Sequence, residues 1–135
     1  MNQQVDARLR DTAQFKLGMD QKVVAKSAHF ALHASAPDSP SDTEAAQVMI
    51  QAKATHLIGA VIPKRWAKRA VTRNAIRRQI YQAWSQWLAC LPAGVHVVRL
   101  KTAFDVQRFR SATSPAFKSA VRAELNQLFQ HRAGT

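Results

Sequence analysis

The chain has 135 residues, the usual length of one domain, and 47% of them are apolar, which is enough to build a core. Its 20 Lys and Arg residues outnumber eight Asp and Glu residues, so the formal charge is +12 and the protein should attract polyanions, either nucleic acid or an anionic membrane. The chain has no membrane-spanning run and no signal-like start, and Cys90 is its single cysteine, so we expect a cytoplasmic protein without disulfides or a cysteine-held zinc ion.

The first half of the chain predicts one helix and several short strands. Val5–Phe15 has the spacing of a short helix, and Lys22–Ala34 contains partly alternating β-branched and aromatic residues, which indicates one or two strands broken near Ser27. Ser35–Thr43 is rich in proline and turn-forming residues and predicts a loop. Ala45–Ala54 fits a strand or a helix.

The second half predicts two strands and two helices. Leu57–Ile62 is a short apolar run stopped by proline, which is typical of a buried strand. Trp66–Ala89 has helical spacing, and Val95–Leu100 is again strand-like. Ser114 and the following proline form a helix start, after which apolar residues recur every three or four positions to the end. We expect residues 1–135 to form a single domain with flexible ends and a long loop at about 35–55.

The charges are separated along the sequence. Between Glu44 and Asp105 there is no acidic residue but ten Lys and Arg residues, and seven of these ten lie in 64–78. On a helix, the apolar face of the second half continues into a row of arginines in the first half, Arg69, Arg73 and Arg77. Burying these unpaired guanidinium groups would cost several kcal/mol each, so the first half should extend past the core as an exposed basic ridge.

The ridge has the chemistry of an RNA-binding surface. The planar guanidinium group donates to two phosphate oxygens at once, and a repeat of four residues places such groups roughly 6 Å apart along a helix. Asn74, within the row, adds an amide suited to ribose hydroxyls or base edges. Arg122 lies on a helix of mixed charge, and we expect it to contribute less to RNA binding than Arg73.

Protein-based catalysis has little support in the sequence. Phosphodiester hydrolysis with Mg²⁺ requires clustered carboxylates, and the basic centre of the chain has none. His29 and His33 have the spacing of a metal pair on a helix, but the local pattern is that of a strand. Trp84 and Trp87 have the spacing of core residues, whereas Trp66 fits either the core or a stacking surface.

The segment from Lys64 to Arg78, KRWAKRAVTRNAIRR, resembles the signature helix of the bacterial ribonuclease P protein subunit. The early Arg8, Leu9 and Phe15 and the strands on both sides of the segment extend this resemblance over most of the chain. The chain departs from the family pattern at Ala75, where the family usually repeats Arg, at Met19, where a second Phe is common, and in the longer loop between residues 34 and 56. The resemblance implies that Ala75 weakens one RNA contact and that Met19 makes the family's leader-binding cleft less aromatic.

The resemblance implies an α+β fold, a two-layer α/β sandwich of the ribosomal protein S5 domain 2-like type. Its sheet has about four strands, and the signature helix makes an unusual left-handed βαβ crossover. General handedness rules alone predict the common right-handed connection.

The resemblance also implies a function, removal of the 5′ leader of precursor tRNA by a ribonucleoprotein. In this family the RNA subunit carries the active site and binds most of the Mg²⁺, and the protein alone is inactive. The residues that would face ribonuclease P RNA are Lys64, Arg65, Lys68, Arg69, Arg73, Asn74, Arg77 and Arg78. The candidates for a leader-binding cleft on the sheet are Phe15, Phe30, His29, Lys26 and Lys101, although both phenylalanines also fit the core.

The sequence also fits other classes of function. The charge pattern alone also suits a ribosomal or other structural RNA-binding protein with no part in cleavage. A helix-turn-helix DNA-binding protein is disfavoured because no second helix lies three or four residues from the basic one, so we expect no DNA partner. A membrane-surface helix is disfavoured because its Trp and Arg residues would need opposite faces.

Overall fold

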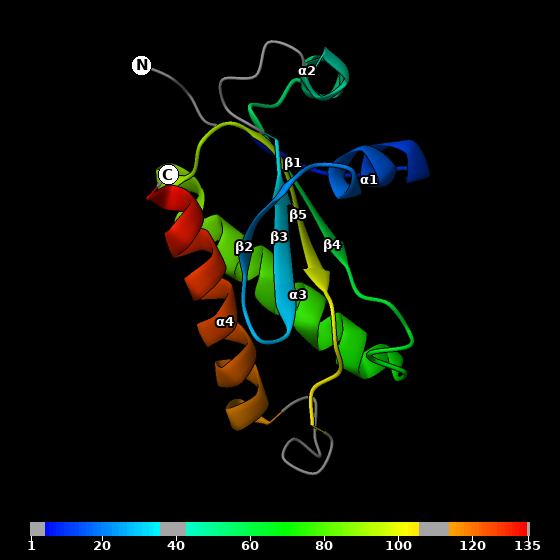
Figure 1. Ribbon diagram of the computed structural model, residues 1–135, viewed down its shortest axis with the longest axis vertical. Coiled ribbons are helices and arrows are strands. Elements are labelled where there is room, and N and C mark those ends of the chain that lie inside the picture. The colour runs from blue at the N-terminus through cyan, green and yellow to red at the C-terminus, as the bar shows by residue number, and fades with distance from the viewer. Residues whose placement is uncertain (1–4, 36–42, 106–113, 135) are drawn as a thin grey trace.

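The computed structural model describes residues 5–35, 43–105 and 114–134, which form a five-stranded sheet with helices on both faces (Figure 1). The strands are β1 (Asp6–Arg8), β2 (Val23–Lys26), β3 (Phe30–Ala34), β4 (His56–Val61) and β5 (Gly94–Leu100). The helices are α1 (Thr12–Met19), α2 (Thr43–Ala52), α3 (Ala70–Trp87) and α4 (Pro115–Ala133). Helices α3 and α4 pack on one face, and α1 and α2 pack on the other.

The strand order β1-β4-β5-β3-β2 places the basic segment at one end of the sheet. β4 runs parallel to both β1 and β5, while β3 is antiparallel to β5 and to β2. The chain leaves β4, passes along α3 behind the sheet in Figure 1 and returns as the adjacent β5, which makes a left-handed crossover. The predicted fold class and this handedness are confirmed, and β1 raises the strand number to five.

Alternating side chains on the central strands supply two cores. Leu32, Val98 and Ile58 point to the α3 and α4 face, whereas Leu57 and Val97 point to the α1 and α2 face. All five side chains are at most 1% exposed. Because both faces of β3 and β5 are covered, these strands are almost continuously apolar, as expected for doubly buried strands.

The predicted helix over Val5–Phe15 is wrong in its first half, where β1 pairs with β4 as a parallel edge strand. The chain then turns at Asp11, whose carboxylate accepts a hydrogen bond from the Gln14 backbone N–H at 2.8 Å and caps α1. A three-residue edge strand is too short to show a period, so only its partner strand defines it.

The signature helix starts four residues later than predicted, at Ala70 instead of Trp66. The N–H groups of Trp66 and Ala67 both donate to the Pro63 carbonyl, which closes a turn before the helix. The ambiguous segment Ala45–Ala54 lies mostly in α2. In the predicted loop Ser35–Thr43, residues 36–42 lie outside the described part of the chain.

The predicted start of α4 is confirmed. The Ser114 hydroxyl accepts a hydrogen bond from the Phe117 N–H at 3.1 Å, and Pro115 occupies the first turn. Among the residues that the structure describes, no helix is long and apolar enough to cross a membrane.

A buried histidine makes the stability of the fold depend on pH. His96 on β5 is fully buried, with its ring centroid 5.1 Å from that of Trp84. Burial, together with the positive charge of Arg132, lowers the pKa of His96 to about 3. The unfolded chain therefore binds a proton at His96 below about pH 6.5, at pH values where the folded protein does not.

We expect the free energy of unfolding to fall as the pH falls from 7 to 5. His96 contributes about 2 kcal/mol to this loss, because over this pH range the His96 side chain takes up a proton in the unfolded chain but not in the folded protein. Urea denaturation at the two pH values measures the change, and His96→Phe, which cannot titrate, should reduce it by that amount. An unchanged pH dependence in the variant would contradict this assignment.

Candidate nucleic-acid interface

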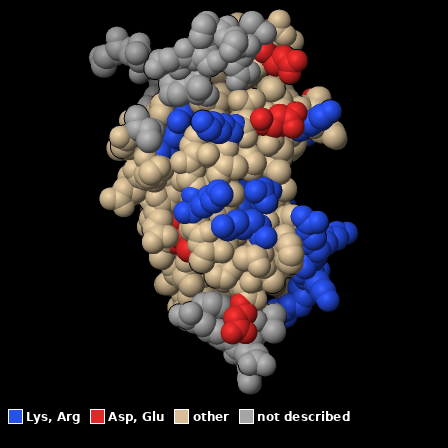
Figure 2. Space-filling view, in the orientation of Figure 1, with Lys and Arg blue, Asp and Glu red and all other residues tan. Residues whose placement is uncertain are grey.

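The predicted basic ridge consists of a loop and the first two turns of a helix. Lys64, Arg65, Lys68 and Arg69 lie in the loop between β4 and α3, and all four are exposed. The remaining members are on α3: Arg73, Asn74, Arg77 and Arg78. Figure 2 shows Lys and Arg side chains gathered at the edge of the molecule where α3 begins.

The packing of α3 accounts for the exposure of this ridge. Ile76, Ile80 and Trp84 are at most 1% exposed and face the sheet and α4, whereas Asn74 and Arg78 face solvent. The helix therefore lies against the core along its second half and presents charged groups beyond it. Ala75, which replaces the Arg usual in the family, is half-buried against the same core.

Arg73 has a structural role that the sequence did not reveal. Its Nη1 donates to the carbonyl oxygens of Ala67 at 3.0 Å and Lys68 at 2.8 Å, and the side chain is half-buried. One guanidinium nitrogen thus closes the basic loop onto the helix. The exposed Lys68 and Arg69 are held in position by this contact and keep their own side chains free of any described hydrogen bond.

The loop also borders an apolar hollow of about 380 Å³. Trp66, Phe104 and Phe117 contribute aromatic side chains to it, and Arg65 and Lys68 lie among its lining residues. The Arg65 guanidinium carbon lies 5.2 Å from the centre of the Trp66 ring. Cationic and aromatic groups are therefore adjacent here, as they are in proteins that bind unpaired bases.

A second basic region lies on the opposite face of the sheet. The strand register aligns Lys26, Ala31, Arg99 and Val61 in one row across β2, β3, β5 and β4. Figure 2 shows Lys and Arg side chains on this side of the molecule, separate from the group at the start of α3. We call this row the sheet-face row.

The Phe15 side chain, on α1, covers the row of residues next to the sheet-face row, at Gly59. A side chain at Gly59 would lie 2.7 Å from Phe15 Cε1, so the close approach of this ring requires glycine at that position. Phe15 is half-buried, and Lys26 is exposed at the end of β2. The ring therefore lies beside the basic row.

Two predicted cleft residues lie elsewhere. Phe30 is fully buried in the core between the sheet and α3 and α4, so its prediction as a leader contact is wrong. His29 is also turned to the α4 side, where its Nδ1 lies 2.6 Å from Glu124 Oε2 and its ring stacks on Phe104 at 3.9 Å. Glu124 also accepts from Ser27 Oγ, and it therefore fixes the β2–β3 turn against α4.

Some residues near these surfaces were missed by sequence reasoning. Arg99 is half-buried in the sheet-face row, and its Nε lies 3.2 Å from His33 Nε2. Lys101, which the sequence did predict for the cleft, follows β5 and is half-buried, with its N–H donating to the His29 carbonyl. Arg8 and Arg122 flank α3 from β1 and α4. Only the strand register and helix packing bring these side chains to the surfaces, so no local motif could identify them.

The acidic side chains do not assemble a metal site among the described residues. Asp6 accepts from Trp84 Nε1 at 3.0 Å, Asp11 caps α1, and Glu124 holds the β2–β3 turn. These carboxylates belong to different elements and already have hydrogen-bond donors.

Comparisons with known proteins agree on one family. The family model described as ribonuclease P matches residues 4–131. The ribonuclease P protein component of Bordetella parapertussis is 34% identical over 92% of this chain and 89% of its own length. That of Paraburkholderia xenovorans is 30% identical over 94% and 81%.

A solved structure shows the same fold. The RNase P protein from Staphylococcus aureus superposes with a TM-score of 0.63, over 93% of this chain and 88% of the other, at 15% identity.

We expect Arg73→Ala to destabilise the protein by about 1 to 2 kcal/mol, because two charged hydrogen bonds to the basic loop are lost. Arg69→Ala should leave the stability nearly unchanged, since the Arg69 side chain makes no capping hydrogen bond. Urea denaturation of both variants measures the difference. Equal stabilities would show that Arg73 does not anchor the loop.

Proposed function

The chain belongs to the ribonuclease P protein family, and we propose that it is the protein subunit of a cytoplasmic ribonuclease P. In this role it binds the catalytic RNA and the 5′ leader of precursor tRNA and assists Mg-dependent removal of the leader. The observation that carries the proposal is the basic surface formed by the loop before α3 and the first turns of α3.

The ridge would bind the RNA subunit through its phosphates. Lys68 and Arg69 are exposed on a loop that Arg73 holds in place, so little conformational entropy is lost when an RNA strand binds. Asn74 Oδ1 accepts from Arg77 Nη1 at 2.9 Å, which leaves the Asn74 amide N–H groups to donate to a ribose or a base.

The sheet-face row would bind the leader. An unpaired strand needs cations along its backbone and flat rings for its bases. Lys26 and Arg99 supply the charge, Lys101 lies just beyond the end of β5, and Phe15 supplies a ring at the border of the row. His29 and Phe30 have no part in this contact, because both face α4.

Bond cleavage would belong to the RNA. The family implies Mg²⁺, which is held best by clustered oxygen ligands. The described carboxylates do not fit such an ion, since Asp6, Asp11 and Glu124 lie on separate elements and are engaged. We propose that Mg²⁺ is bound mainly by the RNA subunit and that the protein contributes binding and orientation.

Reconstitution tests this function. We expect the purified protein to increase leader removal from precursor tRNA only when ribonuclease P RNA is present. Lys68→Ala and Arg69→Ala should weaken RNA binding and lower the slope of log K against log salt by roughly 0.7 to 0.9 for each lost phosphate contact.

The matched control is Lys53→Gln, which removes one charge at the end of α2, on the other face of the sheet. Cleavage by RNA-free protein would overturn the proposal. RNA binding without any stimulation of cleavage would instead favour a structural RNA-binding protein.

A second experiment isolates the leader contact. We expect Phe15→Leu, which keeps the apolar packing on Gly59, to reduce holoenzyme affinity for precursor tRNA and leave that for mature tRNA unchanged. The expected loss is about 1 to 3 kcal/mol per stacked base. Filter binding of the two RNAs gives the ratio.

Phe30→Ala is the core control for this experiment. Its fully buried ring should cost about 3 to 5 kcal/mol of stability when removed, without changing the precursor-to-mature ratio. An unchanged ratio in Phe15→Leu would exclude Phe15 as a leader contact.

A further inference from the structure

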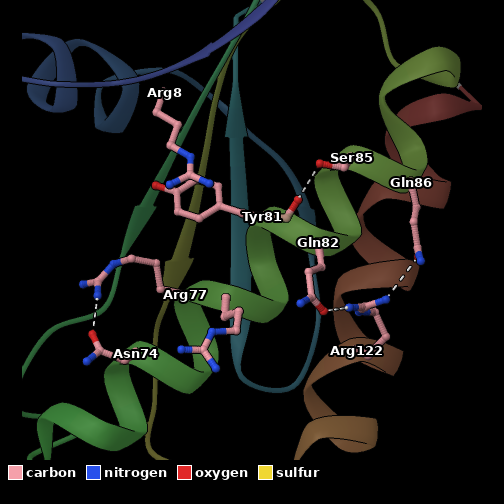
Figure 3. Close-up of a pocket in the computed structure, with 9 residues that line it drawn as sticks. Arg8, Asn74, Arg77, Tyr81, Gln82, Ser85, Gln86 and Arg122 are labelled. Atoms are coloured by element: carbon pink, nitrogen blue, oxygen red, sulfur yellow. Dashed lines mark hydrogen bonds between the residues drawn. The ribbon is translucent and has the colours of Figure 1, made fainter.

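A hollow of about 650 Å³ lies along α3 from Asn74 to Gln86, where β1 and α4 flank the helix (Figure 3). Four arginines from three elements surround it, together with a tyrosine and short polar side chains. Its lining residues are Arg8, Asn74, Arg77, Arg78, Tyr81, Gln82, Ser85, Gln86 and Arg122. Arg77 and Arg78 also belong to the basic ridge, so the hollow continues that surface along α3.

The guanidinium groups in the hollow are oriented by neutral partners. Arg122 donates through Nη1 to Gln86 Oε1 at 3.1 Å and through Nη2 to Gln82 Oε1 at 2.7 Å. The guanidinium carbon of Arg8 lies 3.9 Å from the centre of the Tyr81 ring. Figure 3 shows Arg8 and Tyr81 on one side of α3 and Arg122 with its two glutamine partners on the other. Each contact fixes a cation without cancelling its charge.

Acidic side chains do not neutralise this region. No Asp or Glu is among the described residues that line the hollow. Asp6, two residues before Arg8, accepts from Trp84 Nε1, and Glu124, two residues after Arg122, binds Ser27 and His29. Among the described residues no carboxylate forms an ion pair with an arginine of the hollow, so its excess of positive charge suits an anionic partner.

We propose that this hollow binds a second segment of the RNA subunit by its sugar-phosphate backbone, with Arg8 and Arg122 as phosphate contacts. This inference rests on the proposed function. From Asn74 to Gln86 the helix rises about 18 Å, which is long enough for several consecutive phosphates. Ser85 adds a hydroxyl group that can pair with a ribose 2′-hydroxyl.

The chemistry favours RNA over a lipid surface. A membrane-binding helix presents apolar side chains beside its cations. Here the ring of Tyr81 is the large apolar group among the described lining residues, and Arg8 covers it. The arginines also line a hollow between elements, which matches a strand lying in a groove.

The test uses the full-length protein and ribonuclease P RNA, with the binding constant measured over a range of KCl concentrations. Arg8→Gln and Arg122→Gln should each lower the slope of log K against log salt by roughly 0.7 to 0.9. At 0.1 M salt this corresponds to about a five- to eightfold loss of affinity. Lys53→Gln again serves as the charge-matched control and should change neither quantity.

A second variant separates the charge of Arg122 from its structural hydrogen bonds. The double variant Gln82→Ala/Gln86→Ala removes both hydrogen bonds of Arg122 but keeps its charge. We expect the salt slope of the double variant to stay at the wild-type value. A slope that falls equally in the double variant and in Arg122→Gln would overturn the proposal, because the effect would then follow from the lost hydrogen bonds.

The failure of this inference can be separated from the failure of the proposed function. If Arg69→Ala lowers the salt slope but Arg8→Gln and Arg122→Gln do not, the hollow is not an RNA site and the proposed function stands. If none of the three variants changes RNA binding, both fail together.

Discussion

The cost of burying unpaired guanidinium groups determines where α3 can lie. Its apolar residues, among them Ile80 and Trp84, must be covered by the sheet and α4, whereas Arg73, Arg77 and Arg78 must stay within reach of water or an anion. Both demands are met because the helix lies against the core along its second half. The left-handed crossover then places its charged first half, and the loop before it, at one edge of the molecule.

The same separation of apolar and charged groups shapes the other face of the sheet. Helix α1 covers the row that contains Gly59 and Val97, where Phe15 approaches the backbone. The helix does not cover the next row, which contains Lys26 and Arg99. Strands β3 and β5 are buried on both faces along most of their length. The fold therefore presents two basic regions on opposite sides of one sheet, as the proposed binding of both the RNA subunit and the leader requires.

Much of this arrangement could be predicted from local sequence. The Ser114 cap, the strand before Pro63 and the basic segment all depend on residues close together in the chain, and the structure confirms them. The strand β1 could not be predicted, because three residues carry no period and β4 defines them through long-range pairing. The handedness of the crossover also contradicts general rules, and only the family resemblance supplied it.

The site residues also divide into those that local sequence identifies and those that depend on distant parts of the chain. Phe30 and His29 are residue types suited to a nucleic-acid cleft, but α4, almost 100 residues later in the chain, prevents this role. It helps to bury Phe30, and its Glu124 binds His29. Arg122, which the sequence placed on a helix of mixed charge, lies beside the ridge because α3 and α4 pack together. A charge count along the chain cannot find such residues, since their role depends on neighbours brought together by folding.

The way the arginines are held links stability to binding. Arg73 donates to two backbone carbonyls, Arg77 to an asparagine, and Arg122 to two glutamines. Acidic partners would hold these side chains more strongly, but an RNA phosphate would then have to displace a carboxylate and leave it unpaired. Neutral acceptors avoid this competition. They order the guanidinium groups before the partner arrives and leave their charge available, which explains how a strongly basic surface can be both well defined and free to bind.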